Sequence, residues 1–298
     1  MMVYICVLNY KNPYITIECL NSLLQLQDVR YRIILVDNAS PDDSVSVLQK
    51  YIIEHSDAGQ IIFFPLKKNL GYAGGNNVGL RYALQQKDME YCWILNNDTV
   101  VDSYALLNAI GHMKKNPKIG LCGSKLIYDW DRTKIQGYGG FYRKWLALSI
   151  PCRDVTCIQD IDYVIGAAVL VSRSFLKEIG LMCEDYFLYF EEIDWATRAK
   201  GKFELSCAVD SIVYHKEGAS IGADSIADGK RSALSDYYSI RNKLLFTRRY
   251  HPVCLITVYI SLFVSIYRRF CRREYDRMKF IFKLMLGFHD SKYEKNDI

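Results

Sequence analysis

The first 120 residues alternate between short apolar runs and stretches with helical periodicity, and this alternation limits the fold more than any other feature. The runs VYICVL, RIILVD, IIFFPL and YCWIL predict four strands, at residues 3–8, 32–37, 61–66 and 91–95. Strands separated by helices form βαβ units with right-handed crossovers and parallel strands. The sequence therefore predicts an α/β fold with a mostly parallel central sheet flanked by helices.

Each predicted strand ends in polar residues. Asn9 and Tyr10 follow the first strand, Asp37 ends the second, NLGYAGGNN (69–77) follows the third, and NNDT (96–99) follows the fourth. Ligands of open α/β sheets bind outside the carboxyl ends of the strands, so the four segments together predict one site. Polar connections are also ordinary in such folds, and for Asn9 alone that alternative is preferred.

The segment 69–77 is interpreted as a loop shaped for a polar ligand. Glycine lets the backbone approach a ligand closely, and asparagine tolerates left-handed conformations. The segment lacks the G-x-G-x-x-G spacing of dinucleotide-binding proteins. Gly74 and Gly79 have the glycine spacing of a P-loop, but Leu80 and Arg81 follow where Lys and Ser/Thr are required. Both common nucleotide motifs are therefore absent.

The cysteines and the first residues predict a cytoplasmic protein with reduced thiols. The ten cysteines form no CxxC pair and show no zinc-type spacing. The start MMVYICVLNYKNP has no basic region, and its apolar run is too short for a signal peptide. Hydrophobic residues at 50% and charged residues at 24% are ordinary for a globular protein.

Basic character is concentrated in the C-terminal quarter. Residues 230–298 contain 15 Lys/Arg and 6 Asp/Glu, a net charge of +9, whereas the preceding residues carry −4. The 15 uncharged residues 253–267 lie between basic clusters and are short for a spanning helix, which favours a helix lying on an anionic membrane surface. The alternative is an amphipathic helix packed on the domain or on a second copy of the chain, as in a homodimer. No nucleic-acid partner is predicted.

Seven segments stand in one order along the chain: LNYKN, VDNASPDDS, NLGYAGGNN, ILNNDT, VIGAAVLVSR, FLYFEEIDW and VYHKEGAS. Together they resemble glycosyltransferase family 2, most closely its bacterial rhamnosyltransferase-like members, from about Tyr4 to Tyr250. The resemblance implies a GT-A-type nucleotide-diphospho-sugar transferase fold. It also implies inverting transfer of a sugar, with rhamnose as the first candidate, to a hydroxyl of a surface-glycan or lipid-linked acceptor. The basic, apolar C-terminal segment would then hold the protein at the inner face of the cell membrane, where lipid-linked acceptors lie.

The same resemblance implies a division of the chain. Residues 1–230 would form the catalytic domain, with a nucleotide-sugar-binding half at about 1–120 and an acceptor half at about 121–230. Residues 231–298 would form a basic, apolar helical C-terminal extension.

The resemblance also implies roles for single residues. Glu192 stands where the family usually has a catalytic Asp, with Glu191 as the rival base. Asp98 and His215 would bind Mg²⁺ or Mn²⁺, although Asn96 replaces the first carboxylate of the family's Asp-x-Asp segment. The implied nucleotide-sugar contacts are Asn9, Tyr10, Asp37, Asn69, Gly71, Gly75, Asn76 and Asn97. The implied sugar or acceptor pocket is Gly166, Ala167, Ala168 and Asp194.

Several structural alternatives remain beside these roles. The acidic segment could start a helix favourably for its dipole, the small residues could pack a helix on the sheet, and His215 could be a core histidine. Arg241 and Asn242 are expected either to close over the diphosphate or to belong to a basic helix face. Asn96 and Glu192 also leave open a non-catalytic sugar-nucleotide-binding or scaffold protein with the same fold.

Overall fold

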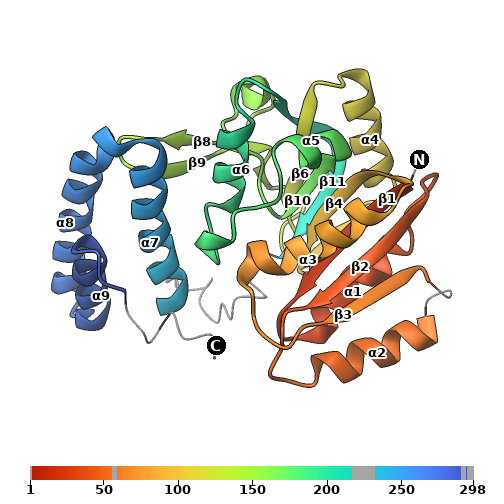
Figure 1. Ribbon diagram of the computed structural model, residues 1–298, viewed down its shortest axis with the longest axis horizontal. Helices are drawn as coiled ribbons and strands as arrows, with labels where there is room; N and C mark the ends of the chain where they lie inside the picture. Colours follow the sequence, from red (N-terminus) through yellow and green to blue (C-terminus); the bar gives the residue numbers. More distant parts are fainter. Residues whose placement is uncertain (1, 56–58, 217–231, 290–292, 294–298) are drawn as a thin grey trace.

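The computed structural model describes residues 2–55, 59–216, 232–289 and 293 (Figure 1). Its strands are β1 (Met2–Asn9), β2 (Tyr31–Asp37), β3 (Ile61–Pro65), β4 (Met89–Asn96), β5 (Thr99–Val101), β6 (Ile119–Tyr128), β7 (Ile135–Gly137), β8 (Gly139–Arg143), β9 (Leu148–Cys152), β10 (Ala168–Ser172) and β11 (Glu204–His215). Its α-helices are α1 (Pro13–Leu23), α2 (Ser44–His55), α3 (Gly71–Gln85), α4 (Ala105–Lys115), α5 (Arg173–Glu178), α6 (Glu191–Ala199), α7 (Ala233–Tyr250), α8 (Leu255–Cys271) and α9 (Tyr275–Met285). The domain boundary expected at residue 230 lies outside the described residues.

The central sheet has the strand order β3-β2-β1-β4-β10-β6-β11-β5, with β7 beside β6. The first four helix-connected strands pair in parallel, as the βαβ pattern predicts. β10 then inserts antiparallel between β4 and β6, and β11 returns parallel to β6. The sheet is therefore parallel in its first half and mixed overall.

Helices cover both faces of this sheet because the buried strands are apolar on both sides. In β1, Val3 and Ile5 pack with α1, α2 and α4, whereas Tyr4 and Cys6 pack with α3, α5 and α6. A strand buried on both faces reads as a continuous hydrophobic run, which is what the sequence shows at residues 3–8.

The C-terminal helices form a separate layer beside the sheet. Figure 1 shows α7, α8 and α9 grouped on one side, with α6 and the β8–β9 hairpin reaching toward them. Their core contains residues of all three helices together with Ala147 at the tip of the hairpin. The segment Pro252–Cys271 is long and apolar enough to cross a membrane, and 17% of its most apolar window is buried.

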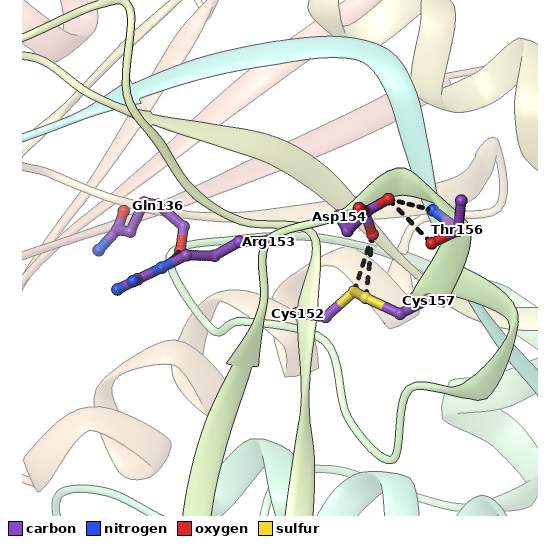
Figure 2. Close-up of a disulfide and its surroundings, with 6 residues drawn as sticks. All are labelled: Gln136, Cys152, Arg153, Asp154, Thr156 and Cys157. Carbon is purple, nitrogen blue, oxygen red and sulfur yellow. Dashed lines mark hydrogen bonds between the residues drawn. A yellow bond between two sulfur atoms is a disulfide. The ribbon is translucent and has the colours of Figure 1, made fainter.

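Cys152 and Cys157 form a disulfide beside β9, so the prediction that all thiols are reduced is wrong for this pair. Figure 2 shows the bridge next to Asp154, whose side chain accepts from Thr156. The sequence spacing gave no signal because the two residues are five positions apart and match no redox or zinc motif. The other eight cysteines are free.

Candidate active site

A buried polar network joins the carboxyl ends of β1, β2 and β4. Asn9 donates through Nδ2 to Asp37 Oδ2 at 2.7 Å, and Thr16 of α1 donates to Asn9 Oδ1 at 2.5 Å. Asn97 in turn donates to Thr16 Oγ1 at 2.8 Å. The structure therefore brings together three residues that the sequence placed at separate strand ends.

The carboxylate of Asp37 accepts three hydrogen bonds from protein groups. It is fully buried and accepts from Asn9, from the Ser40 backbone N at 2.9 Å and from the Ser40 hydroxyl at 2.6 Å. Protein groups thus take three of the about four lone-pair positions of this carboxylate. Tyr10, directly after β1, is half-buried with Lys11 Nζ 5.0 Å above its ring. The nucleotide roles of both residues stay predictions.

The glycine-rich segment is not a loop, because α3 begins at Gly71 and contains residues 71–77. A Cβ on Gly75 would fall within 3.0 Å of the Leu8 side chain, so this glycine lets α3 approach β1. Gly71 has φ +72°, and a Cβ there would fall within 3.0 Å of the Phe187 backbone. Both glycines thus have a packing reason, and their role as a diphosphate cradle stays a prediction.

Two asparagines fix the entry into α3. Asn69 Oδ1 accepts from the Gly71 backbone N and from Asn38 Nδ2, each at 2.9 Å. Asn38 also accepts from the Leu70 backbone N at 2.9 Å and donates to the Gly71 carbonyl at 3.1 Å. Asn76, one turn into the helix, is buried and donates to the Tyr72 carbonyl at 3.0 Å.

Tyr72 connects the start of α3 to the candidate catalytic carboxylates. Its hydroxyl donates to the Gly166 carbonyl at 2.8 Å. A Cβ on Gly166 would lie 3.4 Å from that hydroxyl and 3.8 Å from Glu192 Oε1, so the tyrosine and the glutamate flank the same small residue. Burial raises the pKa of Tyr72 well above its usual value, and the negative charges of Glu192, Glu191 and Asp98 raise it further.

The two glutamates at the start of α6 have raised pKa values. For Glu191, burial is the larger cause and the charge of Glu192 the next. For Glu192, burial raises the pKa. A carboxylate whose pKa is moved toward neutrality is suited to general-base chemistry. Glu191 is 1% exposed and Glu192 is half-buried, so Glu192 is the more accessible of the two.

Asp98 and His215 lie together at the edge where β11 meets β5. His215 Nε2 is 3.2 Å from Asp98 Oδ1, and both side chains are buried. Gln136 Oε1 lies 2.9 Å from His215 Nδ1 and orients the ring. A metal-binding histidine typically has its second nitrogen fixed in this way.

These residues fit a divalent cation that is shared with a diphosphate. Among the described residues, no group of three or more His, Cys, Asp or Glu side chains could hold a metal without other ligands. Mg²⁺ and similar ions are commonly held by one or two carboxylates plus substrate phosphates. Asp98 and the buried His215 Nε2, which are 3.2 Å apart, would provide two such ligands.

Unpartnered polar atoms gather around this site. In the described residues, Asn76 Oδ1, Asn96 Oδ1 and Glu191 Oε1 are buried without a hydrogen-bond partner. Buried polar atoms in native proteins nearly always find a partner, including water or a ligand. These three atoms stand at the start of α3, the end of β4 and the start of α6, whereas Trp93, Tyr142 and Arg269 carry further such atoms away from these positions.

The small residues expected in the sugar or acceptor pocket lie on the β10 side of the site. The Ala167 carbonyl accepts from the Asn96 backbone N at 2.9 Å, and Ala168 is buried in the core where β10 pairs with β4. Gly166 contacts Tyr72 and approaches Glu192. The pocket assignment stays a prediction for all three.

Asp194 is engaged by the protein itself. It is fully buried, accepts from Arg198 Nε at 2.7 Å and from the Tyr250 hydroxyl at 2.7 Å, and also accepts from Tyr186. These contacts favour an orienting role for Asp194 within α6. A role in a sugar pocket stays a prediction.

The turn before α6 is strained. Phe187, Tyr189 and Phe190 have φ values of 65°, 71° and 77°. Such conformations in non-glycine residues cost about 1–3 kcal/mol each and persist only when the surroundings hold them. Asn242 is one of the groups that hold the turn, so its amide does not point to a diphosphate as the sequence interpretation allowed.

Sequence reasoning gave no role to Tyr72, Thr16, Asn38 or Gln136. Tyr72 lies in the segment NLGYAGGNN and Asn38 in the segment VDNASPDDS. Both segments contain other candidate residues, so the sequence could have indicated a role for these two side chains. Thr16 lies in a helix and Gln136 in a short strand, and neither segment differs from ordinary sequence. Their contacts arise only from the fold.

The sequence is similar to those of known proteins. The model of the family described as "Glycosyl transferase family 2" matches residues 3–180. The chain is 25% identical over 203 residues to the low-salt glycan biosynthesis hexosyltransferase Agl10 of Haloferax volcanii, covering 66% of this chain and 61% of that protein. It is 28% identical over 181 residues to the poly-beta-1,6-N-acetyl-D-glucosamine synthase of Staphylococcus epidermidis, covering 60% and 41%.

Solved structures show the same GT-A fold. The mannosyltransferase PcManGT from Pyrobaculum calidifontis, in complex with GDP-Man and Mn²⁺, matches with a TM-score of 0.59, 13% identity and coverage of 99% of this chain and 88% of that one. S. aureus TarS residues 1–349 in complex with UDP-GlcNAc match with a TM-score of 0.54, 18% identity and coverage of 82% and 66%. At these identities the likeness establishes the fold alone.

Proposed function

Because the chain belongs to glycosyl transferase family 2, we propose that it transfers a sugar from a nucleotide-diphosphate donor to a hydroxyl acceptor, with inversion at the anomeric carbon. The observation that carries the proposal is the approach of the Glu191–Glu192 pair to Tyr72 and Gly166, beside Asp98 and His215. Rhamnose is the first candidate sugar, and a growing surface glycan or lipid-linked glycan is the proposed acceptor.

In this mechanism Glu192 accepts the proton of the acceptor hydroxyl as the new glycosidic bond forms. Its half-buried position lets it reach an acceptor, and burial raises its pKa and so favours proton uptake. Tyr72 holds the Gly166 carbonyl, which keeps this side of the pocket in place. The residues at the start of α3 lie where the donor would be oriented.

Asp98 and His215 would hold a divalent cation together with the donor's phosphates. When bound, such a cation stabilises the negative charge of the departing diphosphate. Gln136 fixes the ring of His215, and the carboxylate of Asp98 supplies the hard oxygen that Mg²⁺ and Mn²⁺ prefer. The structure of PcManGT contains Mn²⁺, which supports the proposal of a divalent cation here.

The test is thermal-shift stabilisation by UDP, TDP, GDP and CMP, each with and without Mn²⁺. We expect one nucleotide to raise the melting temperature selectively, a larger rise with Mn²⁺, and loss of the Mn²⁺ increment in Asp98→Ala. Ligand at 100 times its Kd stabilises the native state by about 2.7 kcal/mol. Binding without turnover on any donor and acceptor, unchanged by Glu192→Gln, would instead establish a non-catalytic binding protein. Absence of any shift in a folded sample contradicts both.

We also propose that the C-terminal helices hold the protein on the anionic inner face of the cell membrane. Val253, Ile256, Ile260 and Tyr267 are each more than half exposed along one stripe of the α8 region, while Val258 and Leu262 on the opposite side are buried. Basic residues flank this stripe at both ends, at 248–249 and 268–269. An apolar face between cations suits a helix lying in an anionic interface.

Vesicle co-sedimentation tests this location. We expect binding to phosphatidylglycerol vesicles, weak binding to phosphatidylcholine vesicles, and loss of binding when Ile256 and Ile260 are both changed to Ser. Retention of binding in that double variant would contradict the assignment of the surface. A dimer that dissociates in the same variant would identify the face as a subunit interface instead.

A further inference from the structure

We propose that Asn242 of α7 is a positioning residue for the Glu191–Glu192 pair, acting through the strained turn at residues 186–190. The inference rests on the proposed glycosyl transfer, because it assigns Asn242 to the carboxylates that reaction needs. Asn242 touches neither carboxylate. Its side chain holds the backbone of the turn, which orients the side chains of Glu191 and Glu192.

The side-chain amide of Asn242 is the main polar anchor of the turn. It is fully buried and Nδ2 donates to the carbonyls of Tyr186 at 2.7 Å, Leu188 at 2.7 Å and Tyr189 at 3.1 Å. Its Oδ1 accepts from Arg241 Nη1 at 2.8 Å, which fixes which end of the amide faces the turn. Three carbonyls converging on one donor accept only an N–H group, so no other orientation of the amide is stable.

One face of α7 carries the remaining contacts to the same turn. Ser235 Oγ lies 3.0 Å from the Tyr189 hydroxyl. The Tyr238 ring stacks on the Phe187 ring with centroids 4.8 Å apart, and the centroids of the Phe246 and Phe190 rings are 5.6 Å apart. Positions 235, 238, 242 and 246 are spaced by three and four residues, which places them on one side of a helix. The Asn242 amide therefore lies in the middle of a contact whose other members are two aromatic pairs and the Ser235–Tyr189 hydrogen bond.

The opposite side of the turn is held by α3. The Tyr72 backbone N donates to the Phe187 carbonyl at 2.6 Å, and Gly71 packs directly on the Phe187 backbone. The turn is thus clamped between α3, which carries Tyr72 to the site, and α7. Release on the α7 side lets Phe187, Tyr189 and Phe190 leave their left-handed conformations.

The carboxylates follow the turn without any intervening residue. Phe190 is the residue that precedes the first turn of α6, and Glu191 and Glu192 are the first two residues of that helix. A change of φ at Phe190 therefore redirects both side chains. Displacement of a catalytic group by about 1 Å lowers the rate by about 100-fold, whereas substrate contacts made on α3 and β4 are not moved.

The experiment compares Asn242→Ala and Asn242→Asp with the wild-type chain. Asn242→Asp keeps the shape and removes the donor that faces the carbonyls. Leu106→Ala is the control for lost stability, because Leu106 is a fully buried core residue of α4 on the other face of the sheet. The measurements are steady-state kinetics across pH and hydrogen–deuterium exchange of the peptide containing residues 186–192.

For both Asn242 variants we expect faster exchange at 186–192, a fall in kcat of about 100-fold and a donor KM within a factor of three of wild type. In the wild-type chain Glu192 faces Tyr72, Tyr163 and Glu191. In the variants a looser start of α6 exposes Glu192 to water, which lowers its pKa. The acidic limb of the pH–rate profile should therefore move to lower pH. Leu106→Ala should lower the melting temperature and leave the pH profile in place.

Two results would overturn the inference. Faster exchange at 186–192 with wild-type kcat and pH profile would show that the turn does not aim the carboxylates. Unchanged exchange in both variants would show that Asn242 does not hold the turn. A wild-type chain that turns over no donor contradicts the proposed function instead, and the exchange measurement still decides what Asn242 holds.

Discussion

Alanine at Gly71 should destabilise the protein strongly, because two separate effects oppose it. The backbone there has φ +72°, which costs an L-residue about 1–2 kcal/mol. The new Cβ would also press on the Phe187 backbone, which cannot swing aside as a flexible side chain does, and overpacking of this kind costs about 1–3 kcal/mol. The expected loss in the free energy of unfolding is therefore about 2–5 kcal/mol.

Three other glycines separate these effects. Gly180 has φ +86° with nothing near its Cβ position, so Gly180→Ala should cost only about 1 kcal/mol. Gly75→Ala meets Leu8 in an ordinary helical conformation, and the gain in helix propensity offsets part of the clash, leaving a loss of about 0.5–2 kcal/mol. Gly111→Ala in α4 meets neither obstacle and should stabilise the protein by about 0.5–1 kcal/mol.

The assay is urea unfolding followed by circular dichroism, with nucleotide affinity measured on the folded variants. The expected order of stability is Gly111→Ala, wild type, then Gly75→Ala and Gly180→Ala together, then Gly71→Ala. A Gly71→Ala protein no less stable than Gly180→Ala would refute the close contact with Phe187. Loss of nucleotide affinity in folded Gly75→Ala would restore the cradle role that the sequence suggested for this glycine.

Three further predictions concern single side chains. Glu192→Gln should remove turnover while leaving donor binding within a few-fold, as measured by kcat and by nucleotide thermal shift. Glu191→Gln should raise the melting temperature at pH 8 but not below pH 4.5. The pKa of Glu191 is raised in the folded state, so the stability that its protonated form provides is complete below the ordinary value of 4.5. That stability is lost as the pH rises through the folded-state pKa. Cys152→Ser should lower the free energy of unfolding by roughly 2 kcal/mol without reductant and change little with it, because the bridge closes a short loop.

The first half of the fold was predictable because its signals are local. Buried parallel strands such as β1 and β2 appear as unbroken apolar runs, and their helices appear as periodic segments. The entry of β10 between β4 and β6 was not predictable, because strand order depends on pairing between distant residues. The start of α3 was missed for a different reason. Glycines at 71, 74 and 75 weaken helix propensity, and only close contacts with Phe187, Leu70 and Leu8, respectively, explain them.

The candidate site also contains residues that could be predicted from the sequence and residues that could not. Asp98 follows a predicted strand and His215 was paired with it by the family resemblance alone, and the two side chains lie 3.2 Å apart. Asp194 carries a carboxylate like Glu192 and lies two residues from it, yet its partners are Arg198 and two tyrosines. The direction of a side chain at the start of a helix depends on the preceding turn, and nothing in the letters FLYF indicates three left-handed residues.

The contact between Asn242 and the turn at residues 186–190 also determines the order in which parts of the protein can fold during translation. The Asn242 amide and the Tyr186 carbonyl are 56 residues apart, and closing a flexible segment of that length costs roughly 3–4 kcal/mol beyond a constant term. A nascent chain that has emerged only as far as β11 already contains every strand of the described sheet and both glutamates. It still lacks the helix that holds the turn before them. Full activity would therefore arise only once α7 has left the ribosome and docked, after the sheet itself can form.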